Sequence, residues 1–176
     1  QFAIFVDSAA NIPNDIRVAR DIRVIPFHYI VDGEERPCFS EEMPFVETAK
    51  TFYNAMRDGA EAKTSLLPAA VFEEALRPAL QEGRDVLLFT LSSGVSGTHA
   101  QAQEAGRHLQ EEFPDRKIFV LDSANASLGE GLIAVKVADL RDMGESAEAC
   151  AEWVKENTYK MNSFFTVDDL KYLRRS

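Results

Sequence analysis

The chain has 176 residues, of which 45% are hydrophobic and 27% are charged, a composition typical of one folded domain with its own core. Its formal net charge of −10 argues against nucleic acid and anionic membranes as main partners, while leaving room for transient membrane contact. No apolar run approaches the roughly 20 residues of a membrane-spanning helix, and no signal-peptide pattern opens the chain, so a cytoplasmic location is expected.

The two cysteines, Cys38 and Cys150, lie far apart and have no spacing typical of a metal site. Free cysteines of this kind usually serve as small packing residues. The sequence therefore predicts neither a metal centre nor a structural disulfide.

In the first half of the chain, short apolar runs alternate with helical patterns. The run 2–6 predicts a buried strand that ends at Asp7-Ser8. Asp32-Gly33 supplies a positive-φ turn and predicts a β-hairpin over about 27–39. The other expected elements are a short helix from Pro13 to Arg20, a strand over 23–27, a helix over 43–56, a loop opened by Thr64-Ser65, and a helix from Pro68 to Gly83.

The second half continues the alternation, and its run 86–91 is the strongest strand pattern in the chain. The other expected elements are helices over 99–113, 129–143 and 146–159, strands over 117–121 and 162–167, and an amphipathic stretch that begins at Asp168. Strands that are apolar on both faces and alternate with helices indicate an α/β fold. We therefore expect a mostly parallel sheet flanked by helices, with a small β-hairpin insertion.

The segment Ser92–Thr98, between a buried strand and a helix, is the leading candidate for a functional site. Ser92, Ser93, Ser96 and Thr98 offer hydroxyl groups, Gly94 and Gly97 allow tight turns and close approach, and the following helix start offers free N–H groups. The segment lacks the Gly-Lys-Ser/Thr ending of a Walker A loop and the Gly-x-Gly-x-x-Gly dinucleotide pattern. It predicts a site for a small anionic group such as a carboxylate or a phosphate.

Two other predicted strands end in an acid-serine pair, Asp7-Ser8 and Asp122-Ser123. Ligands of open parallel sheets bind at the carboxyl ends of strands, so these pairs are expected beside the Ser92–Thr98 segment. Each pair is equally well explained as a helix cap. Thr64-Ser65 is a further hydroxyl pair, which is also explained as a turn and cap before Pro68.

A nucleophilic role for Ser96 is the weaker interpretation. A Gly-x-Ser-x-Gly elbow would need glycine where Thr98 stands, and the three histidines, His28, His99 and His108, follow no recognised catalytic order. His99 and His108 fit a surface or core role on their helix. A hydrolase or phosphatase that uses Ser96 remains the alternative function, and an interaction module with an exposed apolar face is a third.

Several segments together resemble the DegV family, whose bacterial members include the FakB fatty-acid-binding proteins. The resemblance extends in order along the whole chain, and it is carried by residues 4–13, 64–68, 92–98, 121–129 and 167–173. It implies an N-terminal α/β domain that carries a hairpin, here residues 1–166, followed by a second α/β domain. Residues 167–176 are then expected to be the start of that second domain, so the chain is expected to be the N-terminal portion of such a protein.

The resemblance also implies a function and a set of site residues. Thr64 and Ser96 would contact the carboxylate of a long-chain fatty acid, with Ser65, Ser92 and Ser93 as close neighbours. The implied partner is a dihydroxyacetone-kinase-like fatty acid kinase, which phosphorylates the bound acid with ATP for bacterial phospholipid synthesis. The protein itself is then a carrier without catalytic residues and without a cofactor other than the bound fatty acid.

Overall fold

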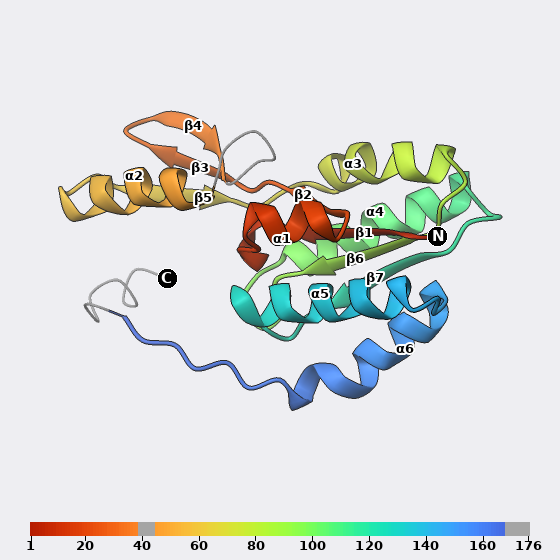
Figure 1. Cartoon of the computed structure of the whole chain (residues 1–176). Coiled ribbons are helices and arrows are strands. Elements are labelled where there is room, and N and C mark those ends of the chain that lie inside the picture. Colours follow the sequence, from red (N-terminus) through yellow and green to blue (C-terminus); the bar gives the residue numbers. More distant parts are fainter. Residues whose placement is uncertain (39–44, 168–176) are drawn as a thin grey trace.

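Four parallel strands form the central sheet of the molecule, which we call sheet A (Figure 1). The structure is a computed structural model, and it describes residues 1–38 and 45–167. The strands are β1 (Ala3–Asp7), β2 (Ile22–Ile25), β6 (Val86–Thr90) and β7 (Ile118–Asp122), in the spatial order β2-β1-β6-β7. Every residue of β1 and β6 is buried, as expected for parallel strands that helices cover on both faces.

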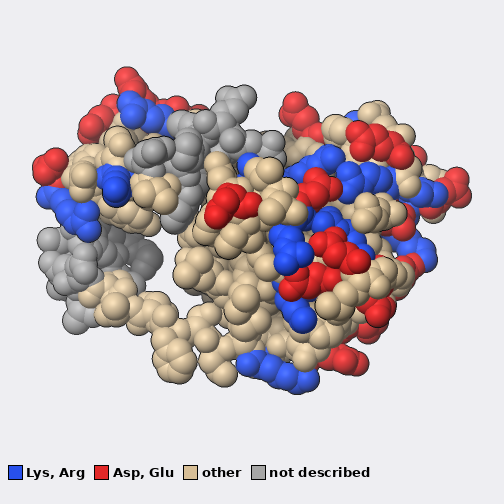
Figure 2. Space-filling model, viewed as in Figure 1, with Lys and Arg blue, Asp and Glu red and all other residues tan. Residues whose placement is uncertain are grey.

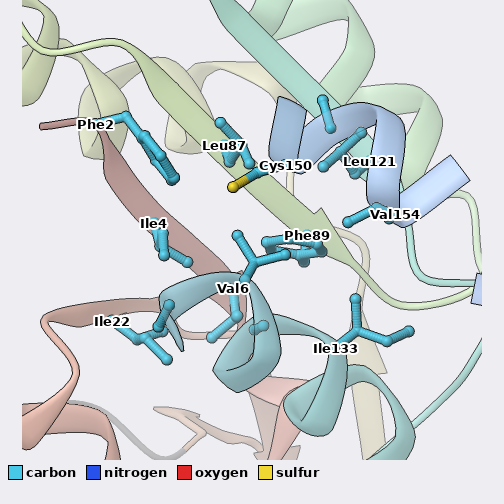
Figure 3. Packing of buried hydrophobic residues seen from close by; sticks show 14 of the residues in the cluster. Phe2, Ile4, Val6, Ile22, Leu87, Phe89, Leu121, Ile133, Cys150 and Val154 are labelled. Atoms are coloured by element: carbon cyan, nitrogen blue, oxygen red, sulfur yellow. The ribbon is translucent and has the colours of Figure 1, made fainter. Parts of the chain in front are cut away.

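Helices cover both faces of sheet A, as the alternating pattern predicts. One face packs against α5 (Leu128–Asp142) and α6 (Ala147–Asn157), and the other packs against α3 (Ala69–Gln81) and α4 (Thr98–Glu112). Figure 3 shows Phe89 on the first of these faces, with Val6 and Ile133 close by. Cys150 is also fully buried there, which confirms its expected packing role, whereas Cys38 is half-buried.

The chain reverses its direction of travel across sheet A between β1 and β6. From β1 it passes through a 3-10 turn, η1 (Ser8–Ala10), and α1 (Asn14–Ala19) to β2 on one side. From β6 it passes through α4 to β7 on the other side. The carboxyl ends of β1 and β6 therefore form a topological switch point, the place where open α/β sheets bind their ligands.

A second, antiparallel sheet carries the predicted hairpin. This sheet B has the order β4-β3-β5, with β3 (His28–Val31), β4 (Glu34–Pro37) and β5 (Ala62–Ser65). Asp32 and Gly33 have φ values of 53° and 82°, which confirms the tight turn. The helix α2 (Phe45–Arg57) packs against sheet B through Phe52, whose ring centroid lies 4.8 Å from that of Tyr29 in β3.

Two predicted elements are wrong. Thr64-Ser65 does not open a loop but ends β5, which pairs with β3; its short polar sequence has none of the apolar alternation that predicts strands. Residues 162–167 form no strand, and Phe164 and Phe165 are exposed instead. An apolar run forms a strand only if it can pair with the free edge of a sheet. The sequence of the run does not show whether such an edge is within reach.

The remaining expected boundaries are close to those observed, and a second 3-10 turn, η2 (Thr158–Lys160), follows α6. The expected end of the hairpin at Phe39, the start of the next helix at Met43 and the stretch from Asp168 lie outside the described residues. Within the described ranges, no helix has the length and the apolar character needed to cross a lipid bilayer.

Gly131 brings α5 against η1 and gives a testable feature of this packing. A Cβ atom at position 131 would lie 2.6 Å from the carbonyl oxygen of Ala10 and 3.0 Å from Cγ1 of Ile12. We expect Gly131→Ala to lower the free energy of unfolding by about 1–3 kcal/mol, because the backbone of η1 must move. Urea denaturation measures this loss. Gly94→Ala is the control, because its Cβ would meet only Ser92 Oγ at 3.5 Å; an equal effect of both variants would contradict the prediction.

Candidate functional site

The loop between β6 and α4, residues 91–97, is held by its own backbone and by β1. The carbonyl of Ser92 accepts hydrogen bonds from the amides of Val95 (3.0 Å) and Ser96 (3.2 Å). These bonds close a tight turn that contains Gly94, as expected, but neither Gly94 nor Gly97 (φ −72°) has the positive φ that favours glycine. A Cβ at Gly97 would lie 3.6 Å from the side chain of Leu66, an ordinary van der Waals distance, so Leu66 lies directly beside this residue.

The hydroxyl groups of the loop divide into two kinds. Ser93 Oγ donates its proton to Asp122 Oδ2 at 2.5 Å, so Ser93 has no second proton for a ligand. Ser96 Oγ and Thr98 Oγ1 lie 2.8 Å apart, and one of their two protons is used between them. The other proton of this pair can be donated to a bound anion. The Ser96–Thr98 pair can therefore donate a proton to a ligand, whereas Ser93 holds the loop in place. Ser92 Oγ accepts a bond from the amide of Gly94 at 3.2 Å and also keeps its own proton.

The start of α4 adds backbone donors beside this hydroxyl pair. The helix has no side-chain cap at Gly97, although Ser96 Oγ accepts a bond from the amide of Thr98 at 3.2 Å. The next amides, of His99 and Ala100, have no acceptor within the helix because they belong to its first turn. The dipole of a 15-residue helix favours negative charge at this end.

The Thr64-Ser65 segment lies next to this loop, although the two are far apart in the sequence. Leu66 follows β5 directly and reaches Gly97, and Gln101 Oε1 of α4 accepts a bond from the amide of Ala69 at 3.1 Å. Thr64 is exposed and Ser65 is half-buried, at the end of β5. The two hydroxyl-bearing segments of the sequence are therefore neighbours.

Asp7 is a buried acid that ties β1 to the loop. Its Oδ2 accepts a bond from the amide of Leu91 at 2.7 Å, and its Oδ1 accepts one from the amide of Ala9 at 2.9 Å. Burial raises the pKa of Asp7 to about 6, although these two hydrogen bonds act in the opposite direction. Asp7 is thus the N-cap of η1, as one of the two interpretations predicts, and it also fixes the first residue of the loop.

Asp122 holds the opposite side of the loop. It accepts bonds from the amide and the hydroxyl of Ser93 and from the amide of Ala124 at 2.8 Å. Burial opposes its ionisation, but these hydrogen bonds outweigh burial and hold the pKa of Asp122 below its ordinary value. Ser123, by contrast, is buried and bonds within its own turn to Asn125. The second acid-serine pair is therefore structural.

The histidines are engaged away from the loop hydroxyls. His99 Nδ1 lies 2.8 Å from Thr90 Oγ1, and burial lowers the pKa of His99 while Asp122 partly opposes that shift. His108 pairs with Glu73 at 2.7 Å, and His28 lies 3.4 Å from Glu35. In the part of the chain that the structure describes, no group of three or more His, Cys, Asp or Glu side chains is placed to hold a metal.

Glu130 is a buried acid that is not among the site residues predicted from the sequence. It lies in the first turn of α5 and has no solvent exposure. Both of its carboxyl oxygens are without a hydrogen-bond partner among the described residues. Burial, and next the charges of Asp7 and Asp122, raise the pKa of Glu130 well above its ordinary value.

The surface near the start of α5 is apolar. On the face of the molecule drawn in Figure 2, Lys and Arg are mixed with Asp and Glu over much of the surface. The surface at the start of α5 and along the extended segment 161–167 is uncharged. A hollow of about 250 Å³ opens between η1, α1 and α5; its lining residues include Ile12, Ile16, Leu128 and Leu132. This volume is below the roughly 300–1,000 Å³ of typical ligand pockets, so the hollow would hold only part of a long aliphatic chain.

The family model that matches the chain covers all of residues 1–176, and it is described as "uncharacterised protein, DegV family". The chain belongs to the DegV family. A DegV domain-containing protein of Clostridium perfringens is 33% identical over 99% of the chain. The chain spans 59% of the length of that relative, and 60% of a Streptococcus pyogenes relative that is 28% identical.

Solved structures of DegV proteins share the fold. A DegV family protein of Thermus thermophilus, described as binding fatty acid, is 28% identical with a TM-score of 0.82 over 99% of this chain and 59% of its own. DegV of Bacillus subtilis, described as a fatty acid binding protein, is 26% identical with a TM-score of 0.78 over the same shares. The α/β fold and the family predicted from the sequence are thus confirmed.

Proposed function

We propose that this DegV protein is a fatty-acid-binding carrier that holds the carboxylate of a long-chain fatty acid at the 91–97 loop. Thr64 and Ser96 make the direct contacts, and Ser65, Ser92 and Ser93 complete the site around them. The observation that carries the proposal is the Ser96–Thr98 hydroxyl pair at the uncapped start of α4, beside the Thr64-Ser65 segment. Relatives above 25% identity described as binding fatty acids support the choice of ligand.

The chemistry of the site suits a carboxylate better than a neutral group. A spare hydroxyl proton and first-turn amides are donors, and the helix dipole adds a favourable field. Hydrogen bonds to a charged group are worth about 1.5–3 kcal/mol each. Burial of each methylene contributes about 0.8 kcal/mol, so a tail of about sixteen carbons gains on the order of 12 kcal/mol before entropic costs. The tail therefore dominates affinity, and the hydroxyls set the position of the head group.

Ser96→Ala tests the role of the hydroxyl pair. We expect it to reduce the preference of the protein for hexadecanoate over hexadecanol by about tenfold, because one charge-assisted hydrogen bond is lost while burial of the tail is unchanged. Competition against a fluorescent fatty acid measures both affinities. Ser146→Ala is the control, because this hydroxyl caps α6 and its loss weakens the fold without touching the loop. An unchanged preference in Ser96→Ala would contradict the head-group site.

The second half of the proposal is that the bound acid is presented to a dihydroxyacetone-kinase-like fatty acid kinase, which forms the acyl phosphate. This step is implied by the family resemblance. In it, the carrier positions the bound acid and supplies no catalytic group. Ser96→Ala should therefore impair acyl phosphate formation by kinase and ATP more than it impairs retention of the lipid. Normal acyl phosphate formation by this variant would remove the proposed role of Ser96.

A hydrolase or phosphatase that uses Ser96 is less well supported by the geometry. Ser96 Oγ lies next to Thr98 Oγ1, and His99 is bonded to Thr90 instead of to a loop hydroxyl. A nucleophilic serine needs a base within hydrogen-bond reach. Incubation with chromogenic esters and phosphates separates the two functions, and turnover that disappears in Ser96→Ala would favour the enzyme.

A further inference from the structure

Glu130 differs in kind from the two acids beside it. Asp7 and Asp122 each accept backbone amide bonds, whereas neither oxygen of Glu130 has a donor among the described residues. Glu130 is also fully buried, so solvent does not supply the missing donors. A buried carboxylate that lacks both a donor and a counter-ion is strongly disfavoured, whereas a neutral acid carries a much smaller penalty.

The charged groups around Glu130 also favour its neutral form over its ionised form. Asp7, at the end of β1, and Asp122, at the end of β7, both act on it, and both are acids. His99 on α4 acts on Asp122. Because the first of two like charges makes the second harder to form, ionisation of Glu130 is opposed from two strands at once.

The same two acids are the anchors of the loop that we propose as the head-group site. Asp7 accepts from the amide of Leu91, and Asp122 accepts from the amide and hydroxyl of Ser93. An ionised Glu130 would add a third negative charge that acts on both of these anchors. Repulsion would then act on the two carboxylates that hold Leu91 and Ser93, and through them on the loop.

We propose that Glu130 is held as a neutral carboxylic acid at neutral pH, and that its ionisation in alkaline solution weakens anion binding at the 91–97 loop. The second half rests on the proposed function, because it takes the loop as the head-group site. Glu130 acts through Asp7 and Asp122 and is a positioning residue. Protonation of one buried side chain would thereby set the pH range in which the carrier retains its ligand.

The protonation state is tested without any ligand. The infrared spectrum of the wild type minus that of Glu130→Gln should contain the C=O band of a protonated carboxyl group at pH 7. The wild type minus Glu111→Gln, a variant of an exposed acid near the far end of α4, should lack this band. Absence of the band from the Glu130 difference spectrum would overturn the proposal, even if fatty acid binding were confirmed.

The pH dependence is tested by binding of hexadecanoate to the wild type and to Glu130→Gln from pH 6 to the pH at which the infrared band disappears. Ionisation of the ligand affects both proteins and cancels in the ratio of their affinities. The affinities should be equal at pH 6, and the wild type should bind on the order of three- to tenfold more weakly than the variant once Glu130 is ionised.

Two outcomes distinguish the inference from the proposed function. A flat affinity ratio across the disappearance of the band would overturn the link between Glu130 and the loop, while leaving fatty acid binding intact. Failure of both proteins to bind hexadecanoate at any pH would overturn the proposed function, and the infrared band would still decide the protonation state. Wild-type spectra at several pH values give that answer even if Glu130→Gln fails to fold, because the band should disappear on alkaline titration.

Discussion

Replacement of Phe89 with alanine is expected to lower the free energy of unfolding by about 3–5 kcal/mol. Phe89 is a fully buried residue of β6, in the middle of sheet A, and it packs in the cluster that α5 and α6 cover (Figure 3). Its removal leaves a cavity that the surrounding strands and helices cannot fill, because β1 and β6 are fixed by their pairing. Urea denaturation followed by circular dichroism measures the loss.

Met143→Ala is the control for this substitution. Met143 is 75% exposed at the end of α5, so its truncation should change stability by less than about 0.5 kcal/mol. A loss below about 1.5 kcal/mol in Phe89→Ala would contradict the central position assigned to β6. The position also matters for the site, because Phe89 lies only two residues before Leu91, whose amide bonds to Asp7.

The free energy of unfolding should depend on pH because Asp7 has a raised pKa in the folded state. Its pKa rises from 3.8 to about 6 on folding, so the folded state binds protons more tightly than the unfolded state. The stability contributed by its protonated form is complete below about pH 4 and is lost as the pH rises through about 6. A shift of about two pH units corresponds to about 3 kcal/mol.

The variant Asp7→Asn isolates this effect. The free energy of unfolding of the wild type minus that of Asp7→Asn should fall by about 2–3 kcal/mol between pH 4 and pH 7. Urea titrations at several pH values provide the measurement, and a Glu130→Gln background removes the coupling between the two acids. Asp115→Asn, a substitution of an exposed acid, serves as control. A difference that does not change with pH would show that Asp7 titrates normally in the folded state.

The sequence predicts sheet A well because its strands are unusual in composition. Runs such as 86–91 are short and apolar on both faces, and these two properties together predict a buried parallel strand. Asp32-Gly33 likewise predicts the hairpin turn from local conformational preference. β5 could not be predicted in this way, because Ala62–Ser65 is a short polar stretch that becomes a strand only by pairing with β3.

The site was predicted in outline but not in its connections. Parallel strands present their carboxyl ends at one edge, so the proximity of Asp7, Asp122 and the 91–97 loop follows from the fold class. The different roles of Ser93 and Ser96 do not follow from the fold class, because they depend on which acceptor lies within reach of each hydroxyl. The contact between Leu66 and Gly97 joins two segments whose separation in the sequence carries no distance information.

Glu130 left a signal that was available in the sequence. It lies three, four and seven residues before Ile133, Ala134 and Val137, which are all buried on the same face of α5. An acid in a buried helical stripe is exceptional, because charged residues are almost never fully buried unless they are paired. The missing partner, in contrast, is a property of the folded arrangement and could be found only in the structure.

The strand order of sheet A has a consequence for biosynthesis. β1 is synthesised before β2, which pairs with one edge of β1 and lies within the next twenty residues. The other edge of β1 pairs with β6, where Ala3 is opposite Val86. At about 5–20 residues per second, the ribosome needs roughly 4–16 seconds to make the intervening chain. During that interval an apolar strand has one unsatisfied edge, which is a template for pairing with other nascent chains. Slow translation between β2 and β6 should therefore reduce the soluble yield of this protein more than slow translation after β7.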